Sequence, residues 1–330
     1  MGVTIKDIAK LANVSHTTVS RALNNSPYIN EETKKKIKAL AEELNYVANY
    51  NAKSLFLLKS YVIGLFLSAI SEGTSDAYFH EIVKGVNKII DKEYNLVIRG
   101  IDKYSHSVDK KNFDGIIVVS QSKKDDEFIK SIIEKDISLV VINRVVDIDN
   151  IVNIVFNDTK GAYEAVDYFV KSNHKKIALI QGNNDFESSV YRKKGYIEAL
   201  NDNNIKINEE YIMNGKYTLD SGYENMKRLL SLKEKPTAVF CENDDIAVGA
   251  MKAVIECGLN VPEDVSIIGF DDRNFCKYVT PTLSSVRKDA SLMSEIGAIN
   301  LLNIIKNKSV KNNKIYIESN LIIRKSVKKL

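Results

Sequence analysis

Apolar residues near the amino end of the chain recur at the spacing of helices. The first stripe occupies positions i, i+3, i+4 and i+7, namely Ile5, Ile8, Ala9 and Ala12. A turn at Asn13, a residue type that tolerates positive φ, leads to Ser15 as an N-cap and then to a second stripe in Val19 and Leu23. A third helix is expected after the N-cap Asn30, with a buried face of Ile37, Leu40, Ala41 and Leu44. The pattern predicts a small three-helix bundle.

From Tyr61 onward, short apolar runs alternate with helical stretches. The runs expected to be buried parallel strands are 62–67, 96–98, 115–119, 139–142, 176–180, 238–241 and 265–268. The expected helices are 78–91, 161–172, 190–201, 221–230, 246–257 and 292–306. This alternation is typical of doubly wound parallel sheets with helices on both faces. Because the strands are too many for one compact sheet, we expect an α/β body of two similar lobes, with ligands bound outside the carboxyl ends of the strands.

Length and charge support a division into a head and a body. A chain of 330 residues suits two or three domains, and 44% hydrophobic and 27% charged residues are ordinary for a globular protein. Residues 1–60 hold nine Lys or Arg against five Asp or Glu, which accounts for the whole net charge of +4. The excess positive charge therefore belongs to the predicted bundle, as expected for a segment that faces phosphates.

The second helix of the bundle presents polar residues on its outward face. These residues are His16, Thr17, Ser20 and Arg21. A plain bundle explains the apolar stripes but not this cluster of small polar side chains with one arginine. Two short helices joined by a tight turn form the unit that places a helix in the major groove of DNA. We therefore expect the head to bind DNA.

Several other chemistries are not indicated. The three cysteines, Cys241, Cys257 and Cys276, lack the spacing of a disulfide framework or a zinc site and are expected to be small buried hydrophobes. Neither a signal segment nor a run of 18 apolar residues occurs, so we expect a cytoplasmic protein without a membrane partner. The four histidines are scattered and no nucleotide-binding or nucleophile-elbow motif occurs, so we expect no metal, no cofactor and no catalytic residue.

Residues 3–24 resemble the signature of the LacI family of bacterial transcription regulators, with Asn13 where the family usually has glycine. The resemblance implies that His16, Thr17 and Arg21 read base edges in the major groove, with Arg21 best placed for a bidentate contact to guanine. It also implies phosphate contacts that fix register without reading sequence, from Thr4, Ser15, Thr18, Ser20 and Asn24.

Residues 46–55 resemble the hinge helix of the same family. In that family a leucine is wedged into the minor groove at the centre of a palindromic site, and Leu55 holds its position. Asn49 is the other DNA contact expected in this segment. Two residues depart from the family pattern. Ala48 replaces the usual proline, which leaves the entry to the hinge less rigid, and Lys53 replaces the usual arginine.

The body resembles the same family and the sugar-binding periplasmic proteins, through residues 157–161, 173–177, 192–196, 241–250 and 258–272. The resemblance implies effector contacts at Arg192, Asn243 and Asp271, whose charged and amide groups suit vicinal hydroxyls. Tyr217 stands where an aromatic ring often stacks on a sugar. Lys288 replaces a familiar uncharged polar residue, which admits a partly anionic effector. The other expected contacts are Ala69, Phe79 and Asn143.

One segment is shorter than the family pattern. About 13 residues connect the strand ending near Arg99 to the strand beginning near Phe113, where the family has a full helix close to its dimer contact. Residues 107–112 have room for little more than one helical turn. The sequence therefore leaves the dimer interface open.

Together these features predict a homodimeric transcription regulator, expected to be a repressor. Its fold class is a small all-α helix-turn-helix domain plus an α/β body of two doubly wound lobes of periplasmic-binding-protein type. The predicted domains are a head at 1–48, a hinge at 49–59 and a body at 60–330. Lobe 1 would comprise about 60–160 plus 289–318, and lobe 2 about 161–288 plus 319–330.

The predicted partners are palindromic double-stranded DNA and a sugar or sugar phosphate bound between the lobes. Two alternatives are an enzyme, which the missing motifs disfavour, and a DNA-bending protein whose body does not respond to ligands. The sequence does not identify the effector, the operator or the target genes, and it does not separate an inducer from a corepressor.

Overall fold

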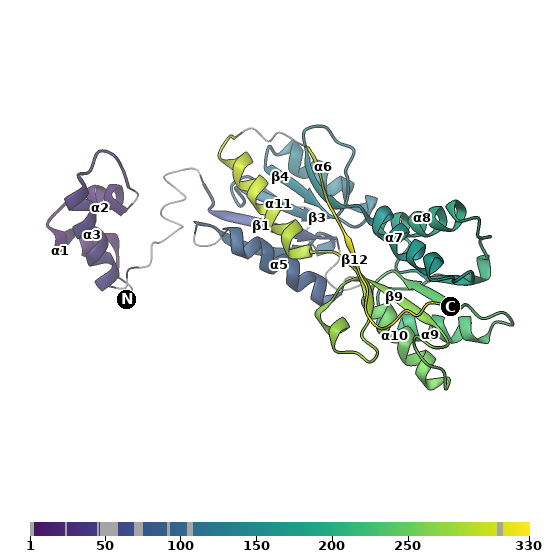
Figure 1. The fold of residues 1–330 in the computed structure, drawn as a ribbon. Helices are drawn as coiled ribbons and strands as arrows, with labels where there is room; N and C mark the ends of the chain where they lie inside the picture. Colours follow the sequence, from purple (N-terminus) through teal and green to yellow (C-terminus); the bar gives the residue numbers. More distant parts are fainter. Residues whose placement is uncertain are drawn as a thin grey trace. The chain divides into compact units, whose positions relative to one another are not determined.

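The computed structural model describes residues 3–23, 25–44, 46, 59–68, 75–90, 93–103, 108–308 and 313–330. The chain divides into two compact units, residues 1–59 and residues 60–330 (Figure 1). Each unit has its own hydrophobic core. Among the described residues, the longest apolar helices are too short or too polar to cross a bilayer.

The first unit is the predicted three-helix head, with α1 (Ile5–Ala12), α2 (His16–Leu23) and α3 (Glu31–Glu43). Asn13 ends α1 in the left-handed region at φ 53°. The Ser15 hydroxyl accepts a hydrogen bond from the Thr18 amide at 3.0 Å, and the Asn30 side chain caps α3 by accepting one from the Thr33 amide at 2.8 Å. The fully buried side chains of this core are Ile8, Val19, Ala22 and Ile37.

The second unit contains two six-stranded sheets. The first has the order β11-β5-β4-β3-β1-β2, and all its neighbouring strands are parallel. Its strands are β1 (Val62–Leu67), β2 (Asn95–Gly100), β3 (Gly115–Val119), β4 (Ser138–Ile142), β5 (Val152–Phe156) and β11 (Lys314–Ile317). The helices beside it are α5 (Asp76–Ile90), α6 (Asp126–Glu134) and α11 (Ala290–Ile305), with short 3-10 turns at Ile101–Lys103 and Lys123–Asp125.

The second sheet has the order β12-β10-β9-β8-β6-β7, with β12 antiparallel to β10. Its strands are β6 (Ile177–Ile180), β7 (Ile212–Met213), β8 (Ala238–Cys241), β9 (Ser266–Asp271), β10 (Ser284–Arg287) and β12 (Asn320–Ile322). Its helices are α7 (Asp158–Lys171), α8 (Glu187–Asp202), α9 (Leu219–Ser231) and α10 (Asp244–Glu256), with 3-10 turns at Glu209–Tyr211 and Asn274–Lys277.

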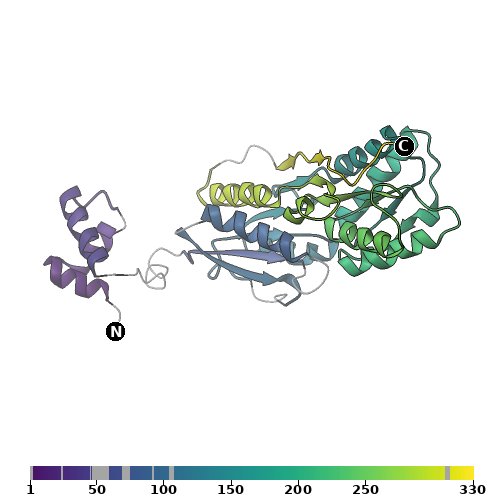
Figure 2. The ribbon, with the colours of Figure 1, turned by 60° about the horizontal axis from the view of Figure 1, so that its bottom comes forward.

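Helices cover both faces of each sheet, because the central strands are apolar on both sides. In β3, Ile117 and Val119 pack in the core that contains α5 and α11, whereas Ile116 and Val118 pack in the core that contains α6. In β8, Val239 packs with α9 and α10, while its neighbours along the strand pack with α7 and α8. Helices α5 and α11 lie side by side, as do α9 and α10 (Figures 1 and 2). Continuous apolar runs are what such doubly covered strands require.

The chain passes between the two sheets three times. It leaves the first sheet between β5 and α7, returns between β10 and α11, and leaves again between β11 and β12. These passages bring the carboxyl ends of strands from both sheets to one region. The last two passages add β11 to the first sheet and β12 to the second sheet. Sequence periodicity did not predict either strand.

The predicted fold class is confirmed, and the element predictions differ in a few places. The sequence did not predict β5, α6, β7 or β10–β12. In β5, Asn153 interrupts the apolar run; its buried side chain accepts a hydrogen bond from the Val146 amide at 2.9 Å. Between β2 and β3, the described residues form only the 3-10 turn at Ile101–Lys103 as helical structure, which fits the predicted short connection. Cys241 and Cys276 are buried as expected, but the prediction for Cys257 is wrong because this side chain is exposed at the end of α10.

Candidate functional site

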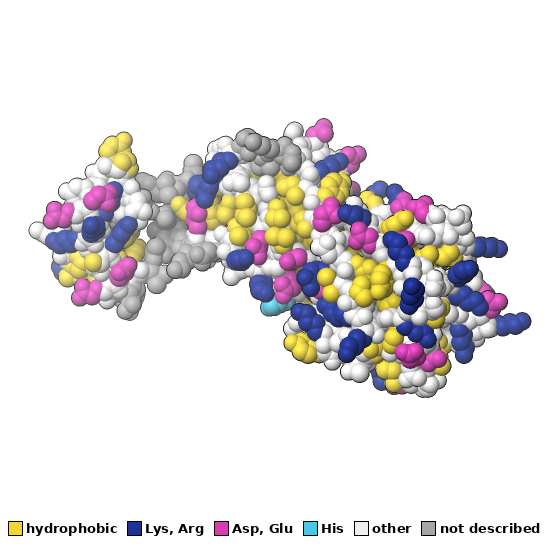
Figure 3. Space-filling view, viewed as in Figure 1, with side chains coloured by type: hydrophobic (Ala, Val, Ile, Leu, Met, Phe, Trp, Pro, Cys, Tyr) yellow, Lys and Arg dark blue, Asp and Glu magenta, His cyan; other side chains and the backbone are white. Residues whose placement is uncertain are grey.

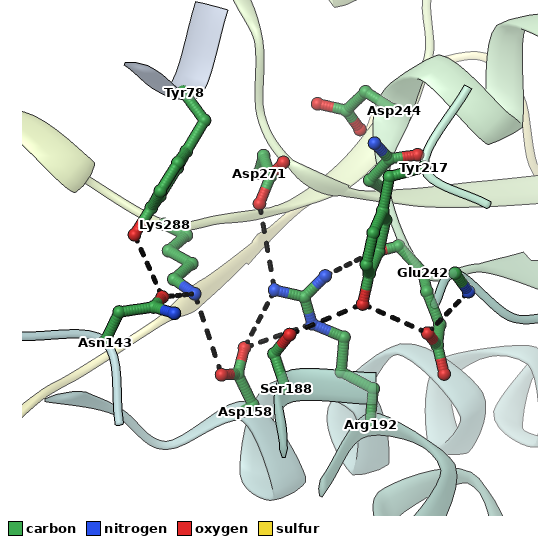
Figure 4. A network of polar contacts seen from close by, with 12 residues as sticks. Tyr78, Asn143, Asp158, Ser188, Arg192, Tyr217, Glu242, Asp244, Asp271 and Lys288 are labelled. Carbon is green, nitrogen blue, oxygen red and sulfur yellow. Dashed lines mark hydrogen bonds and ion pairs between the residues drawn. The ribbon is translucent and has the colours of Figure 1, made fainter. Parts of the chain in front are cut away.

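Residues that follow the strands of both sheets gather in one polar network (Figure 4). Asn143 follows β4, Asp158 follows β5, Asp271 ends β9 and Lys288 follows β10. Because the carboxyl ends of parallel strands meet at one edge of a sheet, short loops there bring such side chains together. The structure therefore groups four residues that are far apart in sequence.

Arg192, on α8, lies at the centre of this network and is only 3% exposed. Its Nε and Nη2 donate to Oδ1 of Asp158 at 3.1 and 3.0 Å, and its Nη1 donates to the carbonyl of Glu242. The guanidinium lies over the ring of Phe270, 3.9 Å from its centroid. Burial opposes the charged form, but the nearby carboxylates, chiefly Asp158, outweigh it and raise the pKa of Arg192. This arginine is therefore a fixed cation.

Lys288 is a second buried cation beside Arg192. Its ammonium donates to Oδ1 of Asn143 at 3.1 Å and lies 3.6 Å from Oδ2 of Asp158. The Tyr78 hydroxyl donates to the same Asn143 oxygen at 2.9 Å. Burial lowers the pKa of Lys288, with Asp158 opposing the shift. Asn143 thus accepts two hydrogen bonds, from Tyr78 of α5 and from Lys288.

Tyr217 forms an aromatic wall of the network. Its ring stacks against Phe186, with centroids 6.0 Å apart and an interplanar angle of 17°. Its hydroxyl donates to Oε2 of Glu242 at 3.3 Å and lies 3.4 Å from the Ser188 hydroxyl. A Cβ at Gly182 would lie 2.2 Å from this ring, so only glycine fits beneath it. Burial raises the pKa of Glu242 to about 7.

Asp271 has an unusual backbone, with φ at 104°, a region that residues with a Cβ rarely adopt. Such strain is often found at functional sites. Its carboxylate oxygens lie 3.9 Å from Nη2 of Arg192 and 3.5 Å from Nη2 of Arg273. The Asn243 side chain caps α10 by accepting from the Ile246 amide at 2.8 Å. Both residues line a cavity inside the network.

A small cavity of about 50 Å³ lies inside the network. Its described lining residues are Ser75, Tyr78, Gln121, Asn143, Phe186, Ser188, Arg192, Tyr217, Asn243, Asp271, Arg273 and Lys288. A wider groove of about 780 Å³ borders it and shares Tyr78, Asp271, Arg273 and Lys288. The inner cavity alone is smaller than a typical ligand pocket of roughly 300–1,000 Å³. A ligand must therefore extend into the groove or displace side chains.

The structure brings together most of the body residues that the sequence predicted. Arg192, Tyr217, Asn243, Asp271, Asn143 and Lys288 all line the cavity. Phe79 packs instead against the core of the first sheet, and its neighbour Tyr78 lines the cavity. Ala69 lies outside the described residues.

Several further residues of the network were not predicted, among them Tyr78, Asp158, Ser188 and Arg273. Asp158 lies two residues after β5, a signal that could have found it. To predict Tyr78, the rotation of α5 about its axis must be known to within one residue. Ser188 was missed because α8 begins three residues before the predicted start.

The head presents its predicted residues on one helix and its flanks. His16, Thr17 and Arg21 of α2 are exposed, while Ser20 is half-buried. Thr4 and Asp7 form a capping box at α1, and the Ser15 and Thr18 hydroxyls are 2.9 Å apart at the start of α2. Asn24, Asn49 and Leu55 lie outside the described residues. An exposed helix with polar side chains and one arginine is chemically suited to base edges.

Buried Asp244 is expected to make the stability of the body depend on pH. Its carboxylate accepts from the Arg273 amide at 2.7 Å and from the Ser285 hydroxyl at 2.5 Å. Burial, together with the nearby Asp271, raises its pKa from 3.8 to about 8. Between these values the folded chain keeps a proton that the unfolded chain has released, so stability falls as the pH rises, by at most about 1.4 kcal/mol per pH unit.

The measurement is the thermal midpoint of the body between pH 7 and pH 8. Burial raises the pKa of Glu242 to about 7, so this group supplies the smaller part of the fall between pH 7 and pH 8, and Asp244→Asn should flatten most of the fall in this window. The matched control Glu242→Gln should flatten mainly the part below pH 7 and leave most of the fall between pH 7 and pH 8. An undiminished fall above pH 7 in Asp244→Asn would assign the pH dependence to other groups.

Two family models match the chain. One is described as "Bacterial regulatory proteins, lacI family" and matches residues 4–49; the other, "Periplasmic binding protein-like domain", matches residues 166–327. A protein of Bacillus subtilis (strain 168), named "Probable HTH-type transcriptional repressor ExuR", is 53% identical over 330 residues, which cover 99% of each chain. The ribose operon repressor of Haemophilus influenzae is 31% identical, covering 98% of each chain.

A solved structure shares the fold over nearly the whole length. It is the lac repressor dimer bound to operator and the anti-inducer ONPF, with a TM-score of 0.84 and 25% identity, covering 99% of this chain and all of that chain. A sugar-binding transcriptional regulator of the LacI family from Escherichia coli, complexed with phosphate, has a TM-score of 0.71 and 28% identity over 82% of this chain.

Proposed function

This chain belongs to the lacI family of bacterial regulatory proteins, and we propose that a ligand in the cavity around Arg192 controls the affinity of its head for operator DNA. As a member of this family it is a DNA-binding transcriptional repressor with a ligand-binding body, and it is not an enzyme. It acts as a dimer on double-stranded operator DNA. We further propose that it does so in the cytoplasm.

The proposed division of labour follows the chain. Residues 1–48 bind DNA, residues 49–59 connect head and body, and residues 60–330 bind the effector and form the dimer. The division into units at residues 59 and 60 supports this assignment, and the two sheets support two lobes within the body. Exposed Leu292 and Ile299 on α11 supply apolar surface for pairing, and Figure 3 shows hydrophobic side chains over this helix.

In the head, we assign base reading to the exposed side chains of α2. His16 and Thr17 would enter the major groove because the first residues of a recognition helix contact base edges. Arg21 lies one turn after Thr17 on the same face of α2 and is assigned a bidentate contact to guanine. Phosphate contacts are assigned to residues beside the two helix starts, Thr4, Ser15 and Thr18, and to Ser20 and Asn24. Two heads of the dimer would occupy the half-sites of a palindrome.

The observation that carries the effector proposal is the set of buried polar side chains around Arg192. Charged groups are rarely buried unless they are paired or bind a ligand. Here Arg192, Asp271 and Lys288 are buried or nearly so and line one cavity beside an aromatic wall. A carboxylate, a guanidinium and amides beside stacked rings are groups that bind polyols, so the effector class is carbohydrate-like.

The test is a thermal-shift screen of the full chain with mono- and disaccharides, their acids and their phosphates. A compound that raises the midpoint should also change the affinity for a palindromic duplex, measured by fluorescence anisotropy at fixed salt. If no compound changes either quantity, the body does not sense ligands and the protein is a ligand-independent DNA-binding protein.

Leu55→Ala tests the hinge. The leucine is assigned to a minor-groove wedge, which unstacks a base step at a cost of a few kcal/mol and stabilises a bent duplex. We expect its loss to reduce the DNA bend, read by gel mobility of circularly permuted fragments, more than it reduces binding to a random duplex. Leu57→Ala, two residues on, is the control. An unchanged bend in Leu55→Ala would remove the wedge from the mechanism.

A further inference from the structure

Arg273 is a buried cation whose hydrogen-bonding groups are incompletely satisfied. Its side chain is 9% exposed, and among the described residues Nε and Nη2 have no hydrogen-bond partner. The carboxylate nearest to it in the cavity, that of Asp271, lies 3.5 Å from Nη2, and Arg192 shares that carboxylate. Leaving donors of a buried guanidinium unpaired is costly, so this arginine is prepared for a further acceptor.

The position of Arg273 makes that acceptor part of a ligand. The side chain lines both the inner cavity and the wider groove beside it. Burial raises the pKa of Asp245, and the charge of Arg273 opposes this rise. The Asp245 side chain forms its hydrogen bond with Ser75. Arg192, by contrast, is fully engaged by Asp158 and the Glu242 carbonyl. Of the two arginines, Arg273 is therefore the one with donors free for a ligand.

The charges around the cavity favour an anion. Its described lining contains three cationic side chains, Arg192, Arg273 and Lys288, and one carboxylate, Asp271. Asp158 lies behind the lining and is already shared by Arg192 and Lys288. Lys288 also has a lowered pKa because it is buried, so an added negative charge would stabilise its charged form. A neutral sugar would leave Nε and Nη2 of Arg273 without a charged acceptor.

The same charges favour one negative charge over two. A carboxylate can accept two parallel hydrogen bonds from the guanidinium fork of Arg273. A phosphate dianion would lie beside Asp271, only 3.5 Å from the same guanidinium, and like charges repel. The nearby N-terminus of α10 offers a phosphate little, because the Asn243 side chain already accepts from the Ile246 amide there and Asp245 lies in its first turn.

We propose, on the basis of the function proposed above, that the effector is a sugar acid whose carboxylate is bound by Arg273 beside Lys288. Its hydroxyls are bound by Asp271, Asn243 and Asn143, and its ring lies against Tyr217. Arg273 thus sets specificity for acids over neutral sugars, while Arg192 holds Asp158 and Asp271 in place.

Isothermal titration of the full wild-type chain compares acids with their neutral counterparts. The probes are D-glucuronate, D-galacturonate and D-gluconate, against D-glucose, D-galactose, the methyl esters of the two uronates, and glucose 6-phosphate. We expect at least one acid to bind ten-fold or more tightly than its hexose, its ester and the phosphate. Equal or tighter binding of a neutral sugar or ester overturns the proposal, and so does tighter binding of the phosphate.

Variants then assign the contact. Arg273→Gln should weaken the acid at least ten-fold more than it weakens the hexose, and Arg273→Lys should recover part of the loss because it keeps the charge but not the fork. Arg228→Gln, on the exposed side of α9, is the matched control. Unchanged acid binding in a folded Arg273→Gln overturns the assignment. If neutral sugars bind as tightly as the acids and shift operator affinity, only this proposal fails; if no sugar of either kind shifts it, the proposed function fails with it.

Discussion

Arg192→Ala should abolish the effect of the effector on operator affinity and destabilise the body by about 3–5 kcal/mol, the usual range for removing one partner of a buried ion pair. Asp158 would lose its two hydrogen bonds, at 3.1 and 3.0 Å, and Phe270 would lose the cation over its ring. The measurements are the free energy of unfolding and operator binding with and without effector. A folded variant that still responds fully would exclude Arg192 from the site.

A milder substitution separates folding from response. Arg192→Lys keeps the charge but cannot reproduce the planar fork, so we expect a more stable protein than the alanine variant with an effector response still at least ten-fold weaker. Lys194→Ala on the same helix is the control: its side chain is 60% exposed and its ion pair with Glu198 contributes little. This control should match the wild type in both measurements.

Arg21→Ala should have the second large effect, a loss of about 1–3 kcal/mol in discrimination between bases at one operator position. Arg21 is exposed in the last turn of α2, where a bidentate contact to guanine is geometrically open. The measurement is the affinity for the selected operator and for operators changed at each position of the half-site. We expect relaxed preference at one position in Arg21→Ala.

Arg21→Lys shows whether charge alone matters. It preserves the phosphate attraction, so binding to random duplex should stay close to the wild type, while discrimination at the same position falls because the fork is lost. If both variants discriminate as the wild type does, the side chain acts on the phosphate backbone or not at all. His16 and Thr17 would then be the remaining base-reading candidates on this helix.

Strands with a continuously apolar sequence could be predicted, and strands that contain polar residues satisfied by distant partners could not. The runs at Val62–Leu67 and Ala238–Cys241 are continuously apolar and were predicted to the residue. The strand Ser284–Arg287 is polar, and its buried Ser284 is satisfied from elsewhere: its amide donates to the Ser326 hydroxyl at 2.8 Å, and its hydroxyl accepts from the Arg324 amide. Neither contact leaves a periodic signal in the sequence.

The residues of the site also differ in how far the sequence predicts them. Asn143 could be predicted because it follows a strand and the topology brings strand ends together, whereas Asp271 was predicted from the family resemblance. Arg273 depends on the sharp turn after Asp271, whose φ of 104° is not encoded by a glycine. Tyr78 depends on the rotation of α5, since one residue along a helix turns a side chain by about 100°. Local geometry of this kind is fixed by packing and not by composition.

The most direct test is reciprocity between the two ligands of the full chain. The effector affinity is measured by calorimetry with and without a saturating palindromic duplex selected by the protein, and the operator affinity with and without saturating effector. We expect each ligand to change the affinity for the other by the same factor, roughly 5- to 150-fold, as thermodynamic coupling requires. An effector that binds equally well to free and operator-bound protein would contradict control of the head by the cavity around Arg192.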